Sequence, residues 1–377
     1  MCGIAGWVDF ELNMSTKVDV LRQMTDTLAN RGPDAGGVWH DAHAAIGHRR
    51  LSIIDLSGGR QPMEAGTIGS RDAVLTYCGE IYNYRELRKQ LQAAGHGFET
   101  ESDTEVLLKA YLEWGADMTG RLNGMYALGI WDRHTEELLL IRDRMGVKPL
   151  YYYPTPTGIL FGSEPKAILA NPAARRRLSI NGLREIFDML KTPELTVYDG
   201  MFEVRPGHIL RFGRKGLSKR AYWSLQAAPH TDDQATTVET VRAILSDTVK
   251  RQMVADVPIC TLLSGGLDSS AITGFAAQSQ GARTVRSFSV DFKNNMENFE
   301  VDAVRGAPDA PFARALAAHV GAAHTEVLLD SSELLDSTVR GNVLRALDMP
   351  SVYWGDMWPS LYLLFRSIKQ HSPDRAT

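Results

Sequence analysis

The two halves of this 377-residue chain carry different secondary-structure patterns, and this contrast limits the folds that the chain can adopt. In the first half, short strand-like segments are mixed with a few helices, which is typical of stacked antiparallel sheets with helices covering their outer faces. In the second half, strands and helices alternate, which predicts a parallel sheet covered on both sides. We therefore predict an α+β domain over residues 1–228, a polar linker over residues 229–237 and an α/β domain over residues 238–377.

Hydrophobic spacing predicts the individual elements. In the first half, strands are predicted at Gly3–Phe10, Ala44–His48, Ala73–Tyr77, Met125–Trp131 and Leu138–Ile141, a hairpin at Tyr151–Tyr153 and Ile159–Phe161, and helices at Val18–Ala29, Tyr84–Ala94 and Thr104–Trp114. In the second half, helices are predicted at residues 238–253, Leu267–Gln278 and Phe312–His319, and strands at Val257–Leu263, Val285–Phe292 and His324–Leu329. The last three strands are the candidates for the parallel sheet.

Composition excludes several classes of protein. The net charge of −4 gives no reason to expect a nucleic-acid partner, and no apolar run approaches the roughly 20 residues that span a bilayer. The three cysteines, Cys2, Cys78 and Cys260, do not form a disulfide framework. A reducing compartment, the cytoplasm, is therefore expected.

A thiol lies one residue from the translation start, in Met1-Cys2-Gly3-Ile4. Cysteine is a small second residue, so removal of Met1 is expected, and it leaves Cys2 as the N-terminal residue. A free α-amino group titrates at about 7.7–8.0 and a thiol at about 8.5, so the amine can accept the thiol proton near neutral pH. The sequence thus predicts an N-terminal nucleophile that carries its own base.

A second motif follows the predicted strand that ends at Leu263. It consists of Ser264, Gly265, Gly266, Leu267, Asp268, Ser269 and Ser270. Backbone N–H groups converge where a strand passes into a helix, and the helix N-terminus favours an anion. The two glycines allow close approach of phosphate oxygens, and Asp268 suits a Mg²⁺ ion that bridges phosphates. No Gly-Lys-Ser/Thr follows, so this is not a Walker loop.

These two motifs resemble those of the glutamine-hydrolysing asparagine synthetase family. Its members combine a class II glutamine amidotransferase domain that begins Met-Cys-Gly-Ile with an ATP-pyrophosphatase-type synthetase domain. Further matches run in register through the chain: Arg31–Asp34, His48–Asp55, Gly79–Asn83, Ser102-Asp103, Arg142–Arg144, Gly146, Ser163-Glu164 and Lys166. The resemblance covers nearly all of the sequence and implies an N-terminal-nucleophile fold followed by an α/β ATP-binding domain.

The resemblance also implies roles in binding and hydrolysing glutamine. Cys2 would attack the side-chain amide and form a thioester, releasing ammonia. Arg50 would hold the carboxylate of glutamine and Asp103 its amino group, as their charges suit. The remaining residues of the implied glutamine pocket are Leu51, Ser52, Ile53, Ile54, Cys78, Gly79 and Glu80.

In the second domain, the resemblance implies that ATP, with Mg²⁺ held by Asp268, activates aspartate as an acyl-adenylate. Ammonia, passed through a tunnel, then displaces AMP to give asparagine. Leu262 and Val290 would flank the adenine, because they close consecutive strands at the carboxyl edge where open α/β sheets bind ligands. The resemblance suggests a homodimer as well.

One departure from the family concerns the residue before Gly79. Family members have asparagine there, and its amide helps to form the oxyanion hole, whereas this chain has Cys78. A thiol is a weak donor, and loss of one oxyanion donor costs about 100- to 1000-fold in rate. A slow glutaminase, or one with another donor, is therefore expected. We also hypothesise that Cys78 and Cys2 form an inhibitory disulfide under oxidation, which is tested by whether both thiols stay free after mild peroxide treatment.

The second departure is the end of the sequence. In family members, the segment resembling Leu361–Ser372 leads into a strand and a Ser-Gly-Glu-Gly-x-Asp-Glu loop, but residues 373–377 do not match that strand. We interpret the synthetase domain as truncated. Three functions stay open: an asparagine synthetase homologue, another ATP-dependent amide-forming amidotransferase of natural-product metabolism, and a non-catalytic remnant that binds ATP or glutamine.

Overall fold

The computed structural model describes residues 1–66, 72–188, 190–280, 285–301, 306–348 and 355–371, so residues 373–377 lie outside the described residues. The chain divides into two compact units, Met1–Ala227 and Ala228–Thr377. Each unit is described by itself.

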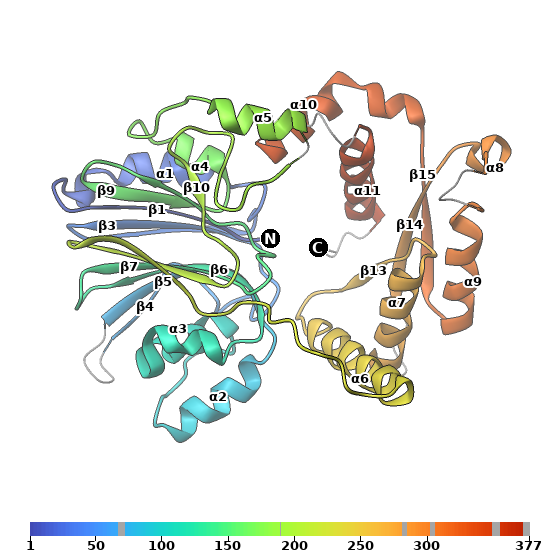
Figure 1. Ribbon diagram of the computed structural model, residues 1–377, viewed down its shortest axis with the longest axis horizontal. Helices are drawn as coiled ribbons and strands as arrows, with labels where there is room; N and C mark the ends of the chain where they lie inside the picture. Colours follow the sequence, from blue (N-terminus) through green and yellow to red (C-terminus); the bar gives the residue numbers. More distant parts are fainter. Residues whose placement is uncertain (67–71, 189, 281–284, 302–305, 349–354, 372–377) are drawn as a thin grey trace. The chain divides into compact units, whose positions relative to one another are not determined.

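The first unit contains two antiparallel sheets stacked face to face (Figure 1). One has the strand order β10-β8-β9-β1-β3-β2 and the other β12-β11-β7-β6-β5-β4. The strands are β1 (Gly3–Asp9), β2 (Ala35–His40), β3 (Ala44–Arg50), β4 (Met63–Gly66), β5 (Asp72–Ile81), β6 (Gly124–Asp132), β7 (Glu137–Arg142), β8 (Tyr151–Pro154), β9 (Gly158–Gly162), β10 (Phe202–Glu203), β11 (His208–Gly213) and β12 (Gly216–Ala221). The prediction of stacked antiparallel sheets is confirmed.

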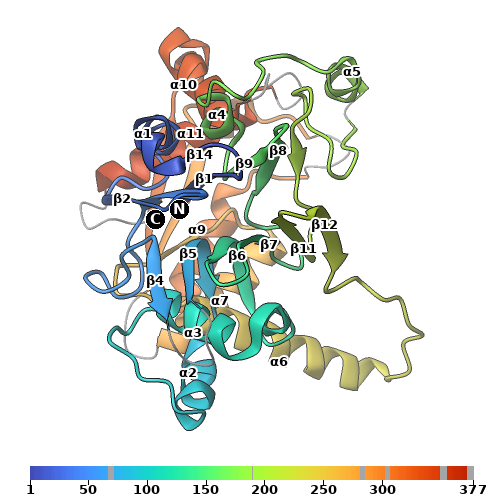
Figure 2. The same ribbon diagram turned by 90° about the vertical axis from the view of Figure 1, so that its left-hand side faces the viewer.

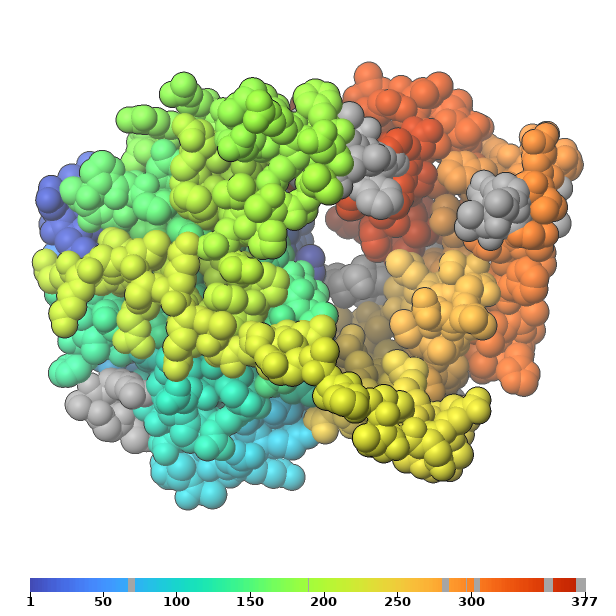
Figure 3. Space-filling model, in the orientation of Figure 1, coloured from blue at the N-terminus to red at the C-terminus, as the bar shows by residue number. Residues whose placement is uncertain are grey.

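Helices cover the outer faces of both sheets. Those of the first unit are α1 (Val18–Asp26), α2 (Tyr84–Ala93), α3 (Asp103–Trp114), α4 (Pro165–Leu169) and α5 (Ile180–Asp188), with short 3₁₀ helices η1 (Met14–Thr16) and η2 (Gly115–Gly120). Helices α1 and α4 pack on the sheet that contains β1, and α3 packs on the sheet that contains β5 (Figure 2). The hairpin end of the second sheet stays uncovered: β12 is exposed along its length and belongs to the yellow-green surface in Figure 3.

Strand β1 lies at the centre of this arrangement, which explains why all seven of its residues are buried. Alternate side chains of a strand point to opposite faces of its sheet. Ile4 and Val8 therefore face the core between the two sheets, which also contains Trp131 and Phe161. Ala5 and Trp7 face the second core under α1 and α4. The residue before β1, Cys2, is thus attached to one of the most constrained strands of the unit.

The second unit contains a parallel sheet with the order β13-β14-β15. Its elements are α6 (Gln234–Gln252), β13 (Cys260–Leu262), α7 (Leu267–Gln280), β14 (Arg286–Phe292), α8 (Asn295–Asn298), α9 (Ala310–Val320), β15 (Ala323–Leu329), η3 (Ser331–Leu335), α10 (Ser337–Leu347) and α11 (Met357–His371). Helices α7 and α9 pack on the strands from one side. On the other side, Phe288, Val327 and Leu329 form a core with Leu363, Leu364 and Ile368 of α11. The predicted parallel sheet, covered on both faces, is confirmed.

Two predicted boundaries in this unit are wrong. Helix α6 begins at Gln234, inside the predicted linker, because the Asp233 side chain accepts a hydrogen bond from the backbone N–H of Thr236 and caps the helix. Strand β13 begins at Cys260 and not at Val257. Pro258 has no N–H to donate to a ladder, so it favours a start after that position.

Candidate active site

A single cavity of the first unit brings together residues from distant parts of the sequence. Of the residues implied in glutamine binding, it is lined by Cys2, Arg50, Leu51, Ile53, Ile54, Gly79, Glu80 and Asp103. Met1, Gln61, Tyr77, Ser102, Thr104 and Lys148 complete its lining. The lining residues come from the start of the chain, the segment after β3, the end of β5 and the start of α3. The fold therefore gathers one thiol and several charged groups around a small space.

The Cys2 thiol is held beside the segment that follows β3. The register of β1 against β3 pairs Gly3 with Arg49, so Cys2 and Leu51 lie at the same end of the two strands. The Leu51 N–H donates to Cys2 Sγ over 3.3 Å. The thiol in turn donates to the Leu51 carbonyl oxygen, with 3.5 Å between sulfur and oxygen. A donor aimed at sulfur stabilises the thiolate relative to the thiol.

Arg31 ties the nucleophile to the rest of the unit. Its Nε donates to the Cys2 carbonyl oxygen over 2.9 Å, and its Nη1 pairs with Glu164 Oε1 over 2.8 Å. Its Nη2 lies 3.8 Å from Cys78 Sγ. Three matched motifs, far apart in the sequence, thus meet at one guanidinium. The fork geometry of arginine allows it to join three partners at once.

Met1 occupies the mouth of this site in the chain as translated. Burial lowers the pKa of its amino group, and its thioether Sδ lies 2.6 Å from Lys148 Nζ. Burial, with a further contribution from Cys78, raises the pKa of the Cys2 thiol to about 11. The chain that retains Met1 therefore holds a protonated, weakly nucleophilic Cys2 at neutral pH.

Arg50 and Asp103 bring opposite charges to the cavity, and both are buried. The Arg50 guanidinium donates to the backbone carbonyl oxygens of residues 54, 55 and 56 over 3.3, 2.6 and 2.8 Å. Asp103 Oδ2 accepts from the Tyr77 hydroxyl over 2.9 Å and from the Ile81 N–H over 3.1 Å. Burial nevertheless raises the pKa of the Asp103 carboxyl. An ammonium group bound beside the Asp103 carboxylate would favour its charged form and so lower its pKa again.

Gly79 and Glu80 close the cavity at the end of β5. Gly79 has φ of +155°, and a Cβ added to it would lie 2.1 Å from the Met125 carbonyl oxygen across the β5–β6 ladder. Only glycine therefore fits this close approach. Glu80 follows on the cavity wall, and burial, with the nearby Asp103, raises the pKa of its carboxyl to about 7.

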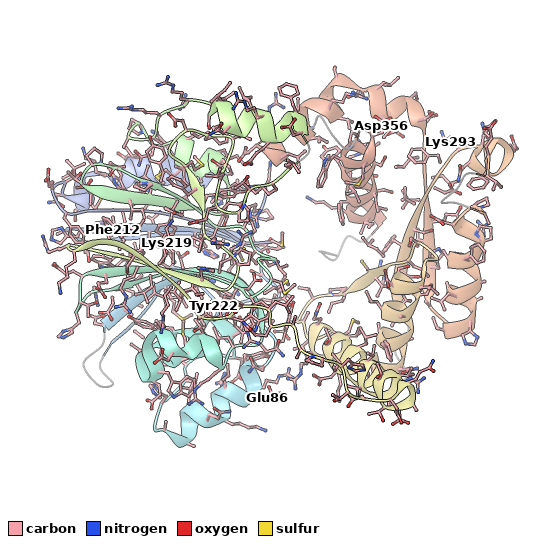
Figure 4. The ribbon with its side chains drawn as sticks, in the orientation of Figure 1. Glu86, Phe212, Lys219, Tyr222, Lys293 and Asp356 are labelled. Atoms are coloured by element: carbon pink, nitrogen blue, oxygen red, sulfur yellow. The ribbon has the colours of Figure 1, made fainter. Side chains whose placement is uncertain are left out.

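The raised pKa of Glu80 makes the stability of the protein depend on pH. Between its usual value of 4.5 and about 7, the folded state binds a proton that the unfolded state releases, so the free energy of unfolding falls as pH rises through that window. We expect Glu80→Gln to remove about 3 kcal/mol of this fall, measured by chemical denaturation at several pH values. Glu86→Gln on α2 is the matched control, since Glu86 is exposed (Figure 4). An unchanged pH dependence in Glu80→Gln contradicts the expectation.

Two implied glutamine-binding residues do not line the cavity. The backbone N–H of Ser52 donates to Asp34 Oδ2 over 2.9 Å, and Ser52 is buried. Cys78 is fully buried, and its thiol donates to the Cys2 carbonyl oxygen over 3.0 Å. Cys2 and Cys78 are both free thiols. Ser52 and Cys78 therefore lie outside the cavity lining, and Cys78 contacts the backbone of the nucleophile.

The sequence analysis missed several lining residues, among them Gln61, Tyr77 and Lys148. Gln61 Oε1 accepts from the Tyr77 N–H over 2.6 Å, and its Nε2 lies 3.4 Å from Thr104 Oγ1. Tyr77 in turn holds Asp103. Lys148 lies two residues after Gly146, which belongs to a matched motif, and that proximity was the one signal available for it.

In the second unit, the predicted loop lies between β13 and α7 and is partly or fully exposed. Gly265 has φ of +87°, and a Cβ there would lie 2.7 Å from the Asp309 carbonyl oxygen, so the turn requires glycine. Ser264 Oγ and Ser269 Oγ lie 3.0 Å apart, and Ser269 Oγ also donates to the Gly266 carbonyl oxygen over 3.2 Å. These bonds shape the loop around the N-terminus of α7, where an anion is favoured.

The remaining residues implied in ATP binding lie near this loop. Leu262 pairs with Phe288 in the β13–β14 register, and Val290 lies two residues further on the same face. Both are exposed, Leu262 by 42% and Val290 by 37%. Leu262 ends β13 as expected, but Val290 does not close its strand, since β14 continues to Phe292. Leu267, Asp268 and Ser270 lie in the first turn of α7, and Asp268 is exposed. Apolar side chains thus lie uncovered beside the loop that connects β13 to α7.

Metal and membrane features are absent from the part of the chain that the structure describes. No group of three or more His, Cys, Asp or Glu residues there is arranged to hold a metal ion. None of the helices described is both long and apolar enough to cross a bilayer. A lone Asp268 still fits Mg²⁺, because that ion is usually bound through one or two carboxylates together with phosphates and water.

The first unit has the features of the N-terminal-nucleophile amidotransferase class: stacked antiparallel sheets, Cys2 at the end of a central strand, and a cavity with opposite charges beside the thiol. A family model described as a glutamine amidotransferase domain matches residues 1–223, and one described as asparagine synthase matches residues 240–373. Since the first match covers more than half of the chain, this protein belongs to the glutamine amidotransferase domain family.

Comparison with curated proteins agrees with both matches. The chain is 41% identical over 375 residues to asparagine synthetase [glutamine-hydrolyzing] 3 of Bacillus subtilis, covering 98% of this chain and 60% of that protein. It is 30% identical to asparagine synthetase [glutamine-hydrolyzing] 1 of the same organism, covering 98% and 56%. It is also 32% identical to the amidase chry2 of Gibberella zeae, covering 89% and 52%. The chain thus spans less than two thirds of the length of these relatives.

Proposed function

We propose that this protein is a glutamine-dependent asparagine synthetase, in which glutamine hydrolysis at Cys2 supplies ammonia to an ATP-activated aspartate. The products are asparagine, glutamate, AMP and pyrophosphate. One observation carries the proposal: the Cys2 thiol shares a cavity with the Arg50 guanidinium and the Asp103 carboxylate. The names of the two Bacillus subtilis relatives support aspartate as the acceptor of the ammonia and glutamine as its donor.

The hydrolytic half of the reaction follows from the site. After removal of Met1, the α-amino group of Cys2 accepts the thiol proton, and the thiolate attacks the side-chain carbonyl carbon of glutamine. Arg50 holds the α-carboxylate and Asp103 holds the α-ammonium group, so the γ-amide lies at the sulfur. Ammonia leaves with a proton from the α-amino group, and water then hydrolyses the thioester to glutamate.

The synthetic half uses the loop between β13 and α7. The loop N–H groups and the serine hydroxyls bind the phosphates of ATP, and the exposed Leu262 and Val290 flank the adenine. Asp268 would supply the protein ligand of Mg²⁺, and the ion would neutralise phosphate charge. The homodimer and the cytoplasmic location stay predictions. Light scattering measures the molar mass in solution and so tests the homodimer.

The assay of choice measures glutamate release from glutamine by the purified chain, with ATP and aspartate present or absent, and quantifies AMP and asparagine. Asparagine and AMP formed in equal amounts support the whole proposal. Cys2-dependent glutamate without AMP supports the hydrolytic half and contradicts the synthetic half for this chain. AMP formation that requires a carboxylate other than aspartate favours an amidotransferase with a different acceptor.

Asp268→Asn tests the nucleotide site directly. Because the carboxylate is the proposed ligand of Mg²⁺, we expect the variant to weaken the binding of Mg²⁺–ATP by about 10- to 100-fold and to leave metal-free ATP nearly unaffected. Equilibrium titration with a non-hydrolysable ATP analogue, with Mg²⁺ or with a chelator, measures both. Asp247→Asn on the exposed face of α6 is the control. Equal losses with and without Mg²⁺ contradict the assigned role.

A further inference from the structure

The cavity contains a buried ammonium group that has no role in the steps above. Lys148 lies between β7 and β8, and its side chain lines the cavity with only 3% of its surface exposed. Its backbone is held on both sides: its N–H donates to Asp143 Oδ2 over 2.9 Å, and its carbonyl oxygen accepts from Arg142 Nε over 2.8 Å. The direction from which the side chain enters the cavity is therefore determined by the fold.

The partner of this ammonium is the residue that processing removes. Nζ lies 2.6 Å from Met1 Sδ, which is the partner recorded for it among the described residues. A thioether is a weak acceptor, and burying an ammonium without a good acceptor costs several kcal/mol. Burial accordingly lowers the pKa of Lys148. Once Met1 is gone, the ammonium is left facing a cavity that contains Cys2.

The other hydrogen-bond donors near Cys2 already have partners. In the proposed hydrolysis Arg50 holds the α-carboxylate of glutamine, and its guanidinium also donates to three backbone carbonyl oxygens of residues 54–56. Arg31 is occupied by the Cys2 carbonyl oxygen and Glu164. The Cys78 thiol, next to Gly79, donates to the Cys2 carbonyl oxygen and does not reach the cavity wall. Cys78, the residue before Gly79, therefore offers no side-chain donor to the cavity.

Lys148 lines the same cavity as Cys2 and Gly79. Of the neighbouring groups that raise the pKa of Lys148, Cys78 acts most strongly, followed by Glu80. Gly79 and Glu80, at the end of β5, line this cavity together with Lys148 and Cys2. The positive charge of Arg31 acts in the opposite direction and lowers the pKa of Lys148.

We propose that the Lys148 ammonium stabilises the oxyanion of the tetrahedral intermediate formed at Cys2, which makes it a further catalytic residue. This inference rests on the proposed glutamine hydrolysis. When the thiolate bonds to the amide carbon, the π electrons of the C=O bond move to oxygen, and Lys148 Nζ donates a hydrogen bond to the resulting alkoxide. The C=O bond re-forms when the C–N bond breaks, and Lys148 keeps its proton throughout. A preorganised donor in a dry site is the main source of such catalysis.

Lys148→Met tests this role, because methionine has a similar length and no charge. We expect kcat for glutamine hydrolysis to fall by about 100- to 1000-fold with KM nearly unchanged, because the donor acts on charge that develops only in the transition state. Lys89→Met, an exposed position on α2, is the matched control. Lys148→Arg retains a cation and is expected to recover part of the activity.

A pH profile provides a readout that a structural role would not affect. Since burial lowers the pKa of Lys148, kcat of the wild type is expected to decline at alkaline pH as the ammonium loses its proton, and Lys148→Met is expected to lack this decline. Restoring an amide donor with Cys78→Asn in the Lys148→Met background is expected to raise kcat again.

Four outcomes overturn the inference. A rise in KM at unchanged kcat makes Lys148 a ground-state ligand of glutamine. If Lys148→Met has a lower melting temperature and its kcat still declines at alkaline pH, the role of Lys148 is structural. Wild-type kcat in Lys148→Met refutes the oxyanion role alone, whereas absence of Cys2-dependent glutamate from the wild type refutes the proposed hydrolysis and this inference with it.

Discussion

Cys2→Ala is expected to lower glutamate release from glutamine by about 10⁵- to 10⁶-fold, the size of effect seen when an enzyme loses its nucleophile. The thiol is the one nucleophile in a cavity whose other polar groups are a guanidinium, an ammonium, carboxyl groups, hydroxyls and an amide. No other side chain of that set forms a thioester. Binding of glutamine is expected to survive, since Arg50 and Asp103 remain.

The measurement is a steady-state assay of glutamate on wild type and variant, after mass spectrometry has shown that Met1 is removed from both. Cys260→Ala, which removes a thiol from β13 of the second unit, is the matched control and is expected to leave hydrolysis unchanged. Activity that persists in Cys2→Ala contradicts the assignment. Loss in both variants points to unfolding, which circular dichroism detects.

Asp103→Asn is expected to lower kcat/KM for glutamine by about 30- to 900-fold, equivalent to about 2–4 kcal/mol for a buried charge pair. Most of this loss is expected in KM, because the carboxylate binds the α-ammonium group, which is remote from the reacting amide. The fold is expected to tolerate the change. The Asn oxygen can still accept from the Tyr77 hydroxyl and the Ile81 N–H, which now reach Asp103 Oδ2.

A matched control for this charge removal is Asp19→Asn, because the Asp19 side chain is 90% exposed on α1. Steady-state kinetics over a range of glutamine concentrations separate the two parameters. A fall in kcat at unchanged KM would falsify the binding role and indicate that Asp103 acts on the reacting groups. Glutamine analogues that lack the α-amino group are expected to be insensitive to the substitution.

Much of the fold was predictable because local pattern and tertiary structure agree. The nearly continuous apolar run in Gly3–Asp9 and the helical spacing in Val18–Asp26 each lead to the observed element. Strands β2 and β10 were not predicted. The first contains two consecutive glycines, and the second has two residues, so neither carries a clear periodicity. Both form because neighbouring strands supply hydrogen-bond partners.

Amphipathic spacing also gave a misleading indication for α6. Val238, Val241, Ile244 and Leu245 fall on one helical face, which normally indicates burial. In the second unit they are between 40% and 60% exposed, and only Val249 of that helix is buried. Periodicity reports which residues share a face, whereas burial depends on what the rest of the structure places against that face.

The predicted chemistry could be inferred from local sequence, because Cys2 at the second position and the Ser264–Ser270 loop are each short runs of adjacent residues. The groups that face Cys2 could not be inferred in this way. The tertiary structure placed Lys148 in the cavity and turned the Cys78 thiol toward the Cys2 carbonyl oxygen. The physical reason is that these neighbours lie on different strands and loops of two stacked sheets. Their contacts follow from register and packing, which no local pattern encodes.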